Sequence, residues 1–259
     1  PMTWQLAPQL PTGVQSVWAA ENNSLDLYTS TGRNGAVFNG AGYTAGKSGQ
    51  AFNFDGVDDY VEVAYAAAQN PAQFTVEAWA RPTGGTGTYR SVVTSRNGSP
   101  VQGYALYASS GNILELFAGN GSTWVVLAGP SVTLNAWTHL AATYDGTTLR
   151  WYVDGTLAAS QAVTIAANTT YPLRIGTGVT EGTPTYFFPG QVDETAIYNR
   201  ALTAAEVTAR YNGSNNTATL LPSGLTFNAA TPAITGTPVH PAVDGNYPLA
   251  VRAVDSQGC

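Results

Sequence analysis

The sequence has little charge: Asp, Glu, Lys and Arg make up 10% of its 259 residues, and the net charge is −6. Because no basic cluster is present, we expect no nucleic-acid partner bound through its phosphates. No apolar run reaches the roughly 18 residues that a membrane-spanning helix needs, so we expect no membrane span. The single cysteine, Cys259, excludes an internal disulfide, so stability must come from packing or from a bound metal.

The chain is instead rich in glycine and proline, with 28 and 15 residues, and in the neutral polar residues Thr, Ser and Asn. Such a weakly charged polar surface is typical of secreted bacterial β-proteins. The first residues, PMTW, lack the charged and apolar regions of a signal peptide. A mature or trimmed secreted protein is expected to lack a signal peptide in this way, and so is a cytosolic protein.

Short apolar runs alternate with polar residues, which is the pattern of half-buried β-strands. The predicted strands are residues 14–19, 51–54, 60–64, 74–81, 90–95, 104–108, 113–118, 124–128, 138–144, 149–153, 157–163, 173–176 and 191–198. In residues 74–79 both alternating faces carry bulk, as in a strand covered on both sides. Asp-Gly pairs at 145–146 and 154–155 favour tight hairpins, which predicts a three-stranded meander over residues 137–163. So many short strands predict an antiparallel all-β sandwich or jelly roll.

One helix is expected after residue 203. Thr203 and Glu206 have the spacing of a capping box, in which each side chain bonds the other residue's backbone. Asn212-Gly213 supplies the stop after about Tyr211. Residues 214–219, SNNTAT, then form a polar linker.

Four segments occur in an order that resembles a known family. They are AFNFDGVDDYVEV (51–63), FTVEAWARP (74–82), WTHLAATYDGTTLRWYVDG (137–155) and GQVDETAIYNRALTAAEV (190–207). Together they resemble the laminin-G-like jelly roll of the concanavalin-A-like lectin/glucanase superfamily over roughly residues 14–212. The resemblance implies an all-β antiparallel sandwich jelly roll with one short C-terminal helix in residues 1–213. It also implies binding of a glycan or surface polymer.

The segment 221–258 contains LPSGLTF, ITGTP and LAVRAVD, and it resembles a bacterial immunoglobulin-like module. An immunoglobulin-like sandwich usually needs about 100 residues, so residues 220–259 are expected to form a partial module, a small β-appendage. A string of such domains implies a protein that is secreted or held on a bacterial cell surface. Its expected partner is a polysaccharide or glycan, and protein partners on that surface stay open.

Calcium binds six to eight oxygen atoms, which turns rich in Asp, Asn and Gly supply. The resemblance implies a structural calcium ion held by an Asp of the final strand, here Asp193, and by the N-terminal segment, where Asp26 matches best. Asp58 and Asp59, next to Asp55, form a second carboxylate cluster in FDGVDDY. Carboxylates in such a turn also accept backbone N–H groups, so a metal-free turn is the alternative.

The glycosidases of this superfamily place E-x-D-x-x-E on one strand, and this chain lacks that spacing. Glu77, Glu115 and Glu194 each lie alone, and Glu77 and Glu194 match positions with a structural hydrogen-bonding role in non-catalytic modules. A catalytic pair would need Glu77 and Glu115 to converge from neighbouring strands. His139 lies in a predicted strand, and no nucleophile-elbow or zinc motif is present. The sequence therefore leans against an enzyme.

Proteins hold sugars with aromatic faces and planar hydrogen-bonding side chains. Trp124 follows a Gly/Asn loop, Tyr186 lies in the aromatic run TYFF, and Arg96 and Arg174 add donors. We predict these four as ligand-binding residues, with ordinary packing or solvation as the alternative. The leading prediction is a calcium-stabilised, non-catalytic carbohydrate-binding or adhesive module. A glycan-active hydrolase or lyase, and a protein–protein interaction or structural spacer domain, are the alternatives.

Overall fold

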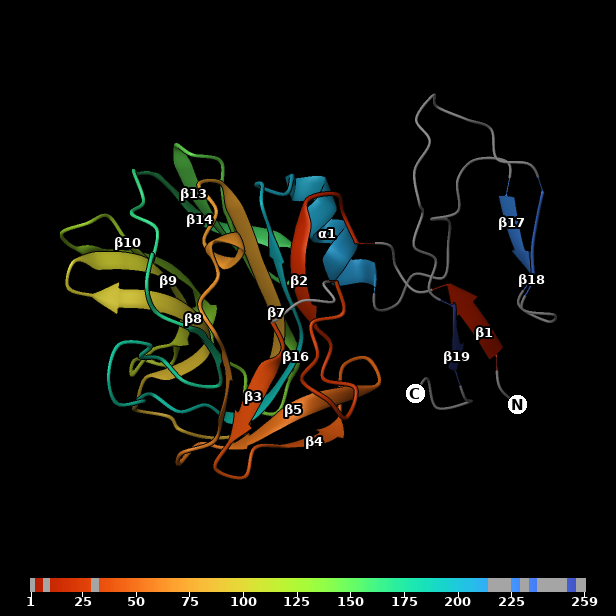
Figure 1. Ribbon diagram of the computed structural model, residues 1–259, viewed down its shortest axis with the longest axis horizontal. Coiled ribbons are helices and arrows are strands. Elements are labelled where there is room, and N and C mark those ends of the chain that lie inside the picture. The colour runs from red at the N-terminus through yellow and green to blue at the C-terminus, as the bar shows by residue number, and fades with distance from the viewer. Residues whose placement is uncertain are drawn as a thin grey trace. The chain divides into compact units, whose positions relative to one another are not determined.

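A computed structural model describes residues 3–6, 10–28, 33–213, 225–228, 233–236 and 251–254 (Figure 1). The chain divides into two compact units. The larger one, Thr12–Tyr211, is the jelly-roll unit, and the second combines Pro1–Pro11 with Asn212–Cys259.

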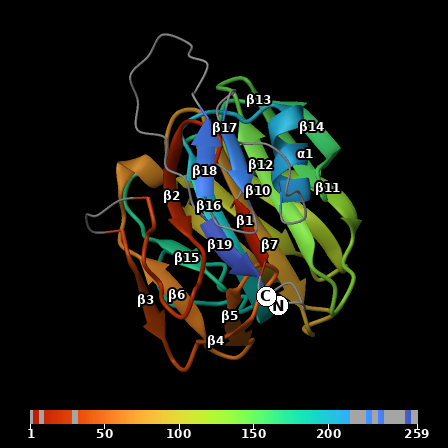
Figure 2. The same cartoon turned by 90° about the vertical axis from the view of Figure 1, so that its right-hand side faces the viewer.

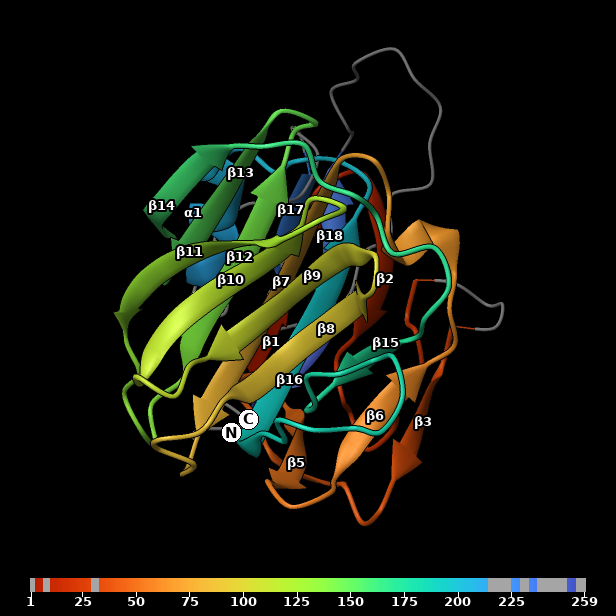
Figure 3. The same ribbon diagram turned by 90° about the vertical axis from the view of Figure 1, so that its left-hand side faces the viewer.

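The jelly-roll unit consists of two antiparallel sheets. Figure 3 shows the seven-stranded sheet in front of the other one. Its strands are, in order, β11 (Trp124–Ser131), β10 (Ile113–Gly119), β9 (Val101–Ala108), β8 (Arg90–Gly98), β15 (Leu173–Ile175), β6 (Tyr60–Val63) and β3 (Gly35–Phe38). The eight-stranded sheet has the order β14 (Thr156–Ala162), β13 (Thr148–Val153), β12 (Thr138–Tyr144), β7 (Phe74–Pro82), β16 (Pro189–Tyr198), β5 (Gln50–Asp55) and β4 (Gly42–Ala45), and β2 (Val14–Trp18) also pairs with β16.

The core lies between the sheets and is built by the alternating apolar side chains that the sequence pattern predicts. Leu106 of β9 and Leu116 of β10 enter it from the seven-stranded sheet, and Val76 of β7 and Leu140 of β12 enter it from the eight-stranded sheet. All four side chains are fully buried. Because strand side chains alternate, every second residue of these strands lies on an outer face.

Helix α1 (Ala204–Gly213) covers the outer face of the eight-stranded sheet (Figure 2). The predicted capping box is confirmed: the Thr203 N–H donates to the Glu206 carboxylate at 2.8 Å, and the Glu206 N–H donates to Thr203 Oγ1 at 3.2 Å. The helix includes Asn212 and Gly213 and so ends slightly later than the sequence predicts. Its cover explains the bulk on both faces of β7, because Trp79 packs its ring 5.7 Å from that of Tyr211.

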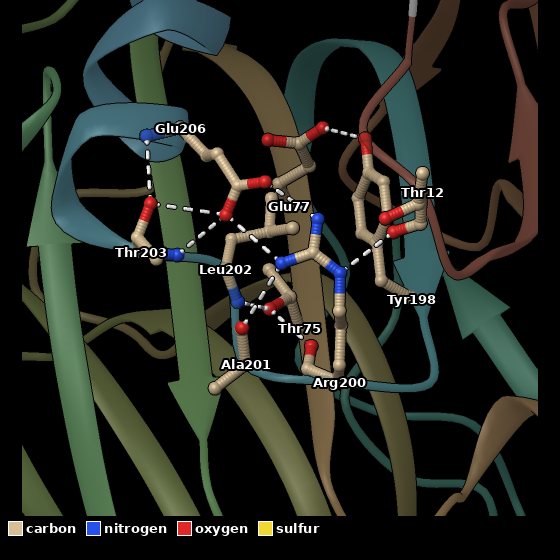
Figure 4. Close-up of polar contacts among 9 residues, drawn as sticks. All are labelled: Thr12, Thr75, Glu77, Tyr198, Arg200, Ala201, Leu202, Thr203 and Glu206. Carbon is tan, nitrogen blue, oxygen red and sulfur yellow. Dashed lines mark hydrogen bonds and ion pairs between the residues drawn. The ribbon is translucent and has the colours of Figure 1, made fainter. Parts of the chain in front are cut away.

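The helix is also fixed through the loop that precedes it (Figure 4). Arg200 pairs with Glu206 at 2.6 Å and donates to the Thr12 carbonyl at 2.8 Å. Thr75 Oγ1 on β7 donates to the Arg200 carbonyl and accepts from the Leu202 N–H, both at 2.8 Å. These contacts hold both ends of the jelly-roll unit, near Thr12 and at α1, to the eight-stranded sheet.

Every predicted strand has a counterpart, with ends shifted by a few residues, and β12–β14 confirm the predicted meander. The sequence pattern missed β3 and β4, whose segments GAVF and GYTA are short and lie among glycines. It also missed the single-turn 3₁₀ helix Ala67–Gln69. No helix in the described ranges is long and apolar enough to cross a membrane.

The described residues of the second unit form two strand pairs. β1 (Thr3–Leu6) pairs antiparallel with β19 (Val251–Val254), and β17 (Leu225–Asn228) pairs antiparallel with β18 (Ala233–Gly236). Thr3–Leu6 thus joins a strand near the C-terminus, whereas the sequence prediction places residues 1–213 in one jelly roll. The predicted linker 214–219 and Cys259 lie outside the described residues.

Candidate ligand-binding site

An aromatic surface lies on the outer face of the seven-stranded sheet. Leu116 points into the core, so its neighbour Phe117 points outward. Phe117 faces Val126 across the β10–β11 pair, and Trp124 lies two residues from Val126 on the same face. Tyr107 of β9 joins them, with its ring centroid 5.2 Å from that of Phe117.

These side chains form the wall of a hollow of ≈ 260 Å³, the aromatic hollow. It is lined by Tyr89, Arg96, Tyr107, Phe117, Trp124 and Tyr186. The Tyr107 ring meets those of Phe117 and Tyr186 edge to face, at interplanar angles of 87° and 90°. This arrangement favours aromatic pairs because the positive edge of one ring meets the negative face of the other.

Arg96 is the charged member of the wall. Its guanidinium lies 4.7 Å from the centre of the Trp124 ring, and its Nη2 is 2.7 Å from the Glu181 carboxylate. Burial alone would lower the pKa of Arg96, but Tyr107 and Glu181 outweigh this and raise it. Burial raises the pKa of Tyr107 to about 12. At neutral pH the wall therefore presents a guanidinium cation beside a protonated phenol.

The loop between β15 and β16 brings Tyr186 over the sheet. The Tyr107 hydroxyl donates to the Gly178 carbonyl at 2.6 Å, and the Arg96 N–H donates to Thr180 Oγ1 at 3.0 Å. Arg174 on β15 bonds the Val179 carbonyl and pairs with Glu62 at 2.7 Å. The loop is thus fixed to the sheet at three successive residues.

A second hollow of ≈ 460 Å³, the hydroxyl hollow, shares Tyr89 and Tyr186 with the first. Its lining consists of Gly56, Gly87, Thr88, Tyr89, Ser110, Tyr186 and Phe187. The Tyr89 and Tyr186 ring centroids are 5.7 Å apart. Fully buried Arg90 donates to the Gly84 carbonyl at 2.7 Å and to Asn112 Oδ1 at 2.9 Å, which ties together the two loops that carry Thr88 and Ser110.

The structure brings together three of the four predicted ligand-binding residues: Arg96, Trp124 and Tyr186. Arg174 does not line either hollow; it is buried, and it stacks 5.3 Å from the Tyr60 ring beside its ion pair with Glu62. Sequence reasoning missed Tyr107 and Phe117. Their alternation with Leu106 and Leu116 was the available signal.

Asp193 and Asp26, predicted to share calcium, are held by different partners. Asp193 is fully buried and accepts the Lys47, Ser48 and Glu194 N–H groups at 2.7–3.0 Å. Burial is the main cause that raises the pKa of Asp193 to about 8, and the negative charge of Glu194 is the second. Asp26 accepts the Val17 and Tyr28 N–H groups at 3.0 Å, and its other oxygen is 3.5 Å from Arg33 Nε.

Asp55, Asp58 and Asp59 carry carboxylate oxygens that lie within 4.8 Å of one another. Asp55 Oδ1 accepts the Val57 N–H at 2.7 Å, and Asp59 accepts the Asp55 N–H at 3.0 Å, as in the turn that the sequence also allows. Burial raises the pKa of Asp59, and the charges of Asp55 and Asp58 add to this. An all-oxygen set of this kind fits calcium chemistry, whereas the guanidinium at Asp26 repels a cation.

Glu77 and Glu115 do not come from neighbouring strands, because β7 and β10 belong to different sheets. Glu77 is fully buried on the α1 side of its sheet. Its carboxylate accepts hydrogen bonds from the Tyr198 hydroxyl and from Arg210 Nε, both at 2.7 Å. It also forms a hydrogen bond with His139 Nε2 at 3.2 Å. These contacts give Glu77 a structural role, as the sequence resemblance implies.

Two family models match the sequence. The one described as "Concanavalin A-like lectin/glucanases superfamily" matches residues 55–208, and the one described as "Putative Ig domain" matches residues 163–259. The two matches overlap over the segment that contains β15 and β16 of the jelly roll. No curated protein matches the chain in sequence.

Several solved structures share the fold. The binding domain of Paraclostridial Mosquitocidal Protein 1 has a TM-score of 0.64 at 18% identity over 79% of this chain, which spans 53% of that domain. Domain 4 of AbnA, an extracellular arabinanase from Geobacillus stearothermophilus in complex with arabinotriose, has a TM-score of 0.58 at 23% identity over 79% of this chain and 98% of that one. The Ruminococcus gnavus sialidase module CBM40, bound to sialyllactose, has a TM-score of 0.51 at 16% identity over 61% of this chain and 96% of that one.

Proposed function

Because the chain belongs to the concanavalin A-like lectin/glucanase superfamily, we propose that it is a non-catalytic carbohydrate-binding module whose site is the aromatic hollow. The observation that carries this proposal is the clustering of five aromatic rings and one guanidinium around a single hollow on a sheet face. Aromatic rings bind the apolar faces of sugars, and a planar donor orients the hydroxyls. Similar folds hold arabinotriose and sialyllactose in other proteins, which supplies the ligand class.

Binding without turnover is the favoured mode because of what lines the site. A glycosidase flanks the scissile bond with two carboxyl groups. None of the described residues that line either hollow is a carboxylate, and Glu181, which contacts the wall, is bonded to Arg96. The buried Glu77 lies on the other sheet.

We also propose that the module acts outside the cell, either secreted or on a bacterial cell surface, where it binds or adheres to polysaccharide. The weakly charged surface and the immunoglobulin-like C-terminal match support this setting. Domain 4 of AbnA, which has a similar fold, is likewise part of an extracellular protein.

The test is a panel of polysaccharides and glycans, scored for retention of the protein and for released products. We expect retention without products. Product release would show an enzyme, and indifference to every glycan would leave a protein-binding or spacer role.

Calcium is proposed at Asp55, Asp58 and Asp59, where three carboxylates approach one another. A cation that binds only the folded state stabilises it according to its concentration. We expect the melting temperature to rise on calcium addition, and Asp58→Asn, which keeps the side-chain shape, to reduce that rise. Equal melting curves in calcium and in chelator would contradict the proposal.

A further inference from the structure

We infer that the ligand is an uncharged oligosaccharide chain that lies across both hollows, and not an acidic sugar held singly by Arg96. This inference rests on the proposed function and narrows it to one ligand class. Two observations carry it: the pairing of the arginines on this face, and the tyrosine pair that the two hollows share.

Arg96 and Arg174 on this face each have a carboxylate partner. Arg96 is the only charged residue among the described residues that line either hollow, and Glu181 lies 2.7 Å from it. The adjacent Arg174 is paired with Glu62 at the same distance. A carboxylated sugar that approached Arg96 would meet the Glu181 carboxylate, and like charges at close range repel. A neutral sugar avoids this cost and can still use the ring faces.

The hollows suit a chain because of their sizes and linings. Binding sites for small molecules usually measure about 300–1,000 Å³, and the aromatic hollow alone is smaller, at ≈ 260 Å³. The hydroxyl hollow of ≈ 460 Å³ adjoins it at Tyr89 and Tyr186, which line both. There Thr88 and Ser110 offer hydroxyl groups and Phe187 offers a ring. A chain that places one sugar among the aromatic rings can place following sugars beside these groups.

The walls of both hollows are held in place before any ligand arrives. Arg90 joins the loops of the hydroxyl hollow through Gly84 and Asn112, and the Tyr107–Gly178 bond fixes the loop that carries Tyr186. Pre-ordered walls lower the entropic cost of binding. If the walls were mobile, the entropic cost of binding would grow with each protein side chain that a longer ligand had to immobilise.

The experiment measures dissociation constants by calorimetry for two ladders of linear oligosaccharides, from monomer to hexamer. One ladder is neutral (arabino- and cello-oligosaccharides) and the other is acidic (oligogalacturonides). We expect the neutral ladder to gain about tenfold or more in affinity with length, equivalent to about 1.4 kcal/mol. The acidic ladder should bind at least tenfold more weakly at equal length.

Two variants separate the parts of this inference. Glu181→Gln removes the counter-charge of Arg96, so it should selectively strengthen binding of the acidic ladder. Phe187→Ala, in the hydroxyl hollow, should weaken the binding of long neutral chains and leave short ones unchanged. Leu157→Ala, at an exposed apolar residue of β14 on the other sheet, is the matched control and should change neither ladder.

Tighter binding of acidic sugars by the unmodified protein would overturn this inference alone, as would equal affinity for neutral monomers and hexamers. Absence of binding to every glycan would instead overturn the proposed function, and the inference with it.

Discussion

Replacement of Glu77 by alanine is expected to lower the free energy of unfolding by about 3–5 kcal/mol, the usual cost of leaving the partner of a buried ion pair uncompensated. Arg210 of α1 reaches Glu77 at 2.7 Å, and its side chain is 11% exposed. Without the carboxylate, this guanidinium has lost its charge partner, and the Tyr198 hydroxyl has lost its acceptor. The helix then loses its main polar attachment to β7.

The same network predicts a dependence of stability on pH. Burial by itself would raise the pKa of Glu77, but Arg210, His139 and Tyr198 outweigh burial and lower the pKa from 4.5 to about 2. A lowered folded-state pKa stabilises the fold fully above the unfolded value. This stabilisation should therefore be complete above pH 4.5 and should be lost as the pH falls towards 2.

Denaturant titrations of the wild type and of Glu77→Ala, repeated across this acidic range, measure both effects. Arg150→Ala is the control, since it removes an ion pair with Asp145 whose side chains are 33% and 34% exposed and should cost only about 0–1 kcal/mol. Glu77→Gln, which cannot titrate, should flatten the acid side of the stability profile. Equal costs for Glu77→Ala and Arg150→Ala would contradict the structural role of Glu77.

Trp124→Ala is expected to weaken glycan binding by roughly tenfold to a hundredfold, the effect of removing an aromatic hot spot of about 2 kcal/mol. Trp124 contributes its ring to the aromatic hollow and also supports the Arg96 guanidinium at 4.7 Å. The ring is only half-buried at the start of the edge strand β11. Its removal should therefore leave the melting transition cooperative.

Affinity gel electrophoresis or calorimetry with a retained glycan measures the loss, and circular dichroism checks the fold. Leu157→Ala on β14 again serves as the control, because Leu157 is 49% exposed and lines neither hollow. Quenching of tryptophan fluorescence by the glycan should be reduced in Trp124→Ala. Unchanged affinity in this variant would place the site elsewhere on the module.

The fold could be predicted largely from the sequence because its information is local. Alternation locates the strands, Asp-Gly pairs locate the hairpins, and Thr203 with Glu206 locates the start of the helix. The prediction that residues 74–79 form a strand covered on both sides is confirmed. The short strands β3 and β4 lacked such a signal, since four residues among glycines show no clear period.

The site was only partly predictable because it is assembled from distant segments. Tyr89 and Tyr186 meet although about half of the jelly-roll unit separates them in sequence. This meeting depends on how the loop 177–188 is fixed to β8 and β9. Arg174 illustrates the same limit. Its sequence context suggested a donor for ligands, but the cross-strand position of Glu62 makes it a fixed part of the sheet.

The placement of α1 and β2 has a mechanical consequence. The ends of the jelly-roll unit, near Thr12 and at Tyr211, both meet the eight-stranded sheet, through the Thr12–Arg200 bond, the β2–β16 pairing and α1. The hollows lie on the opposite outer face. A tether at either end would therefore attach on the side of the unit away from the proposed binding face. Tension along that tether would load the eight-stranded sheet first and reach the hollows only through the core.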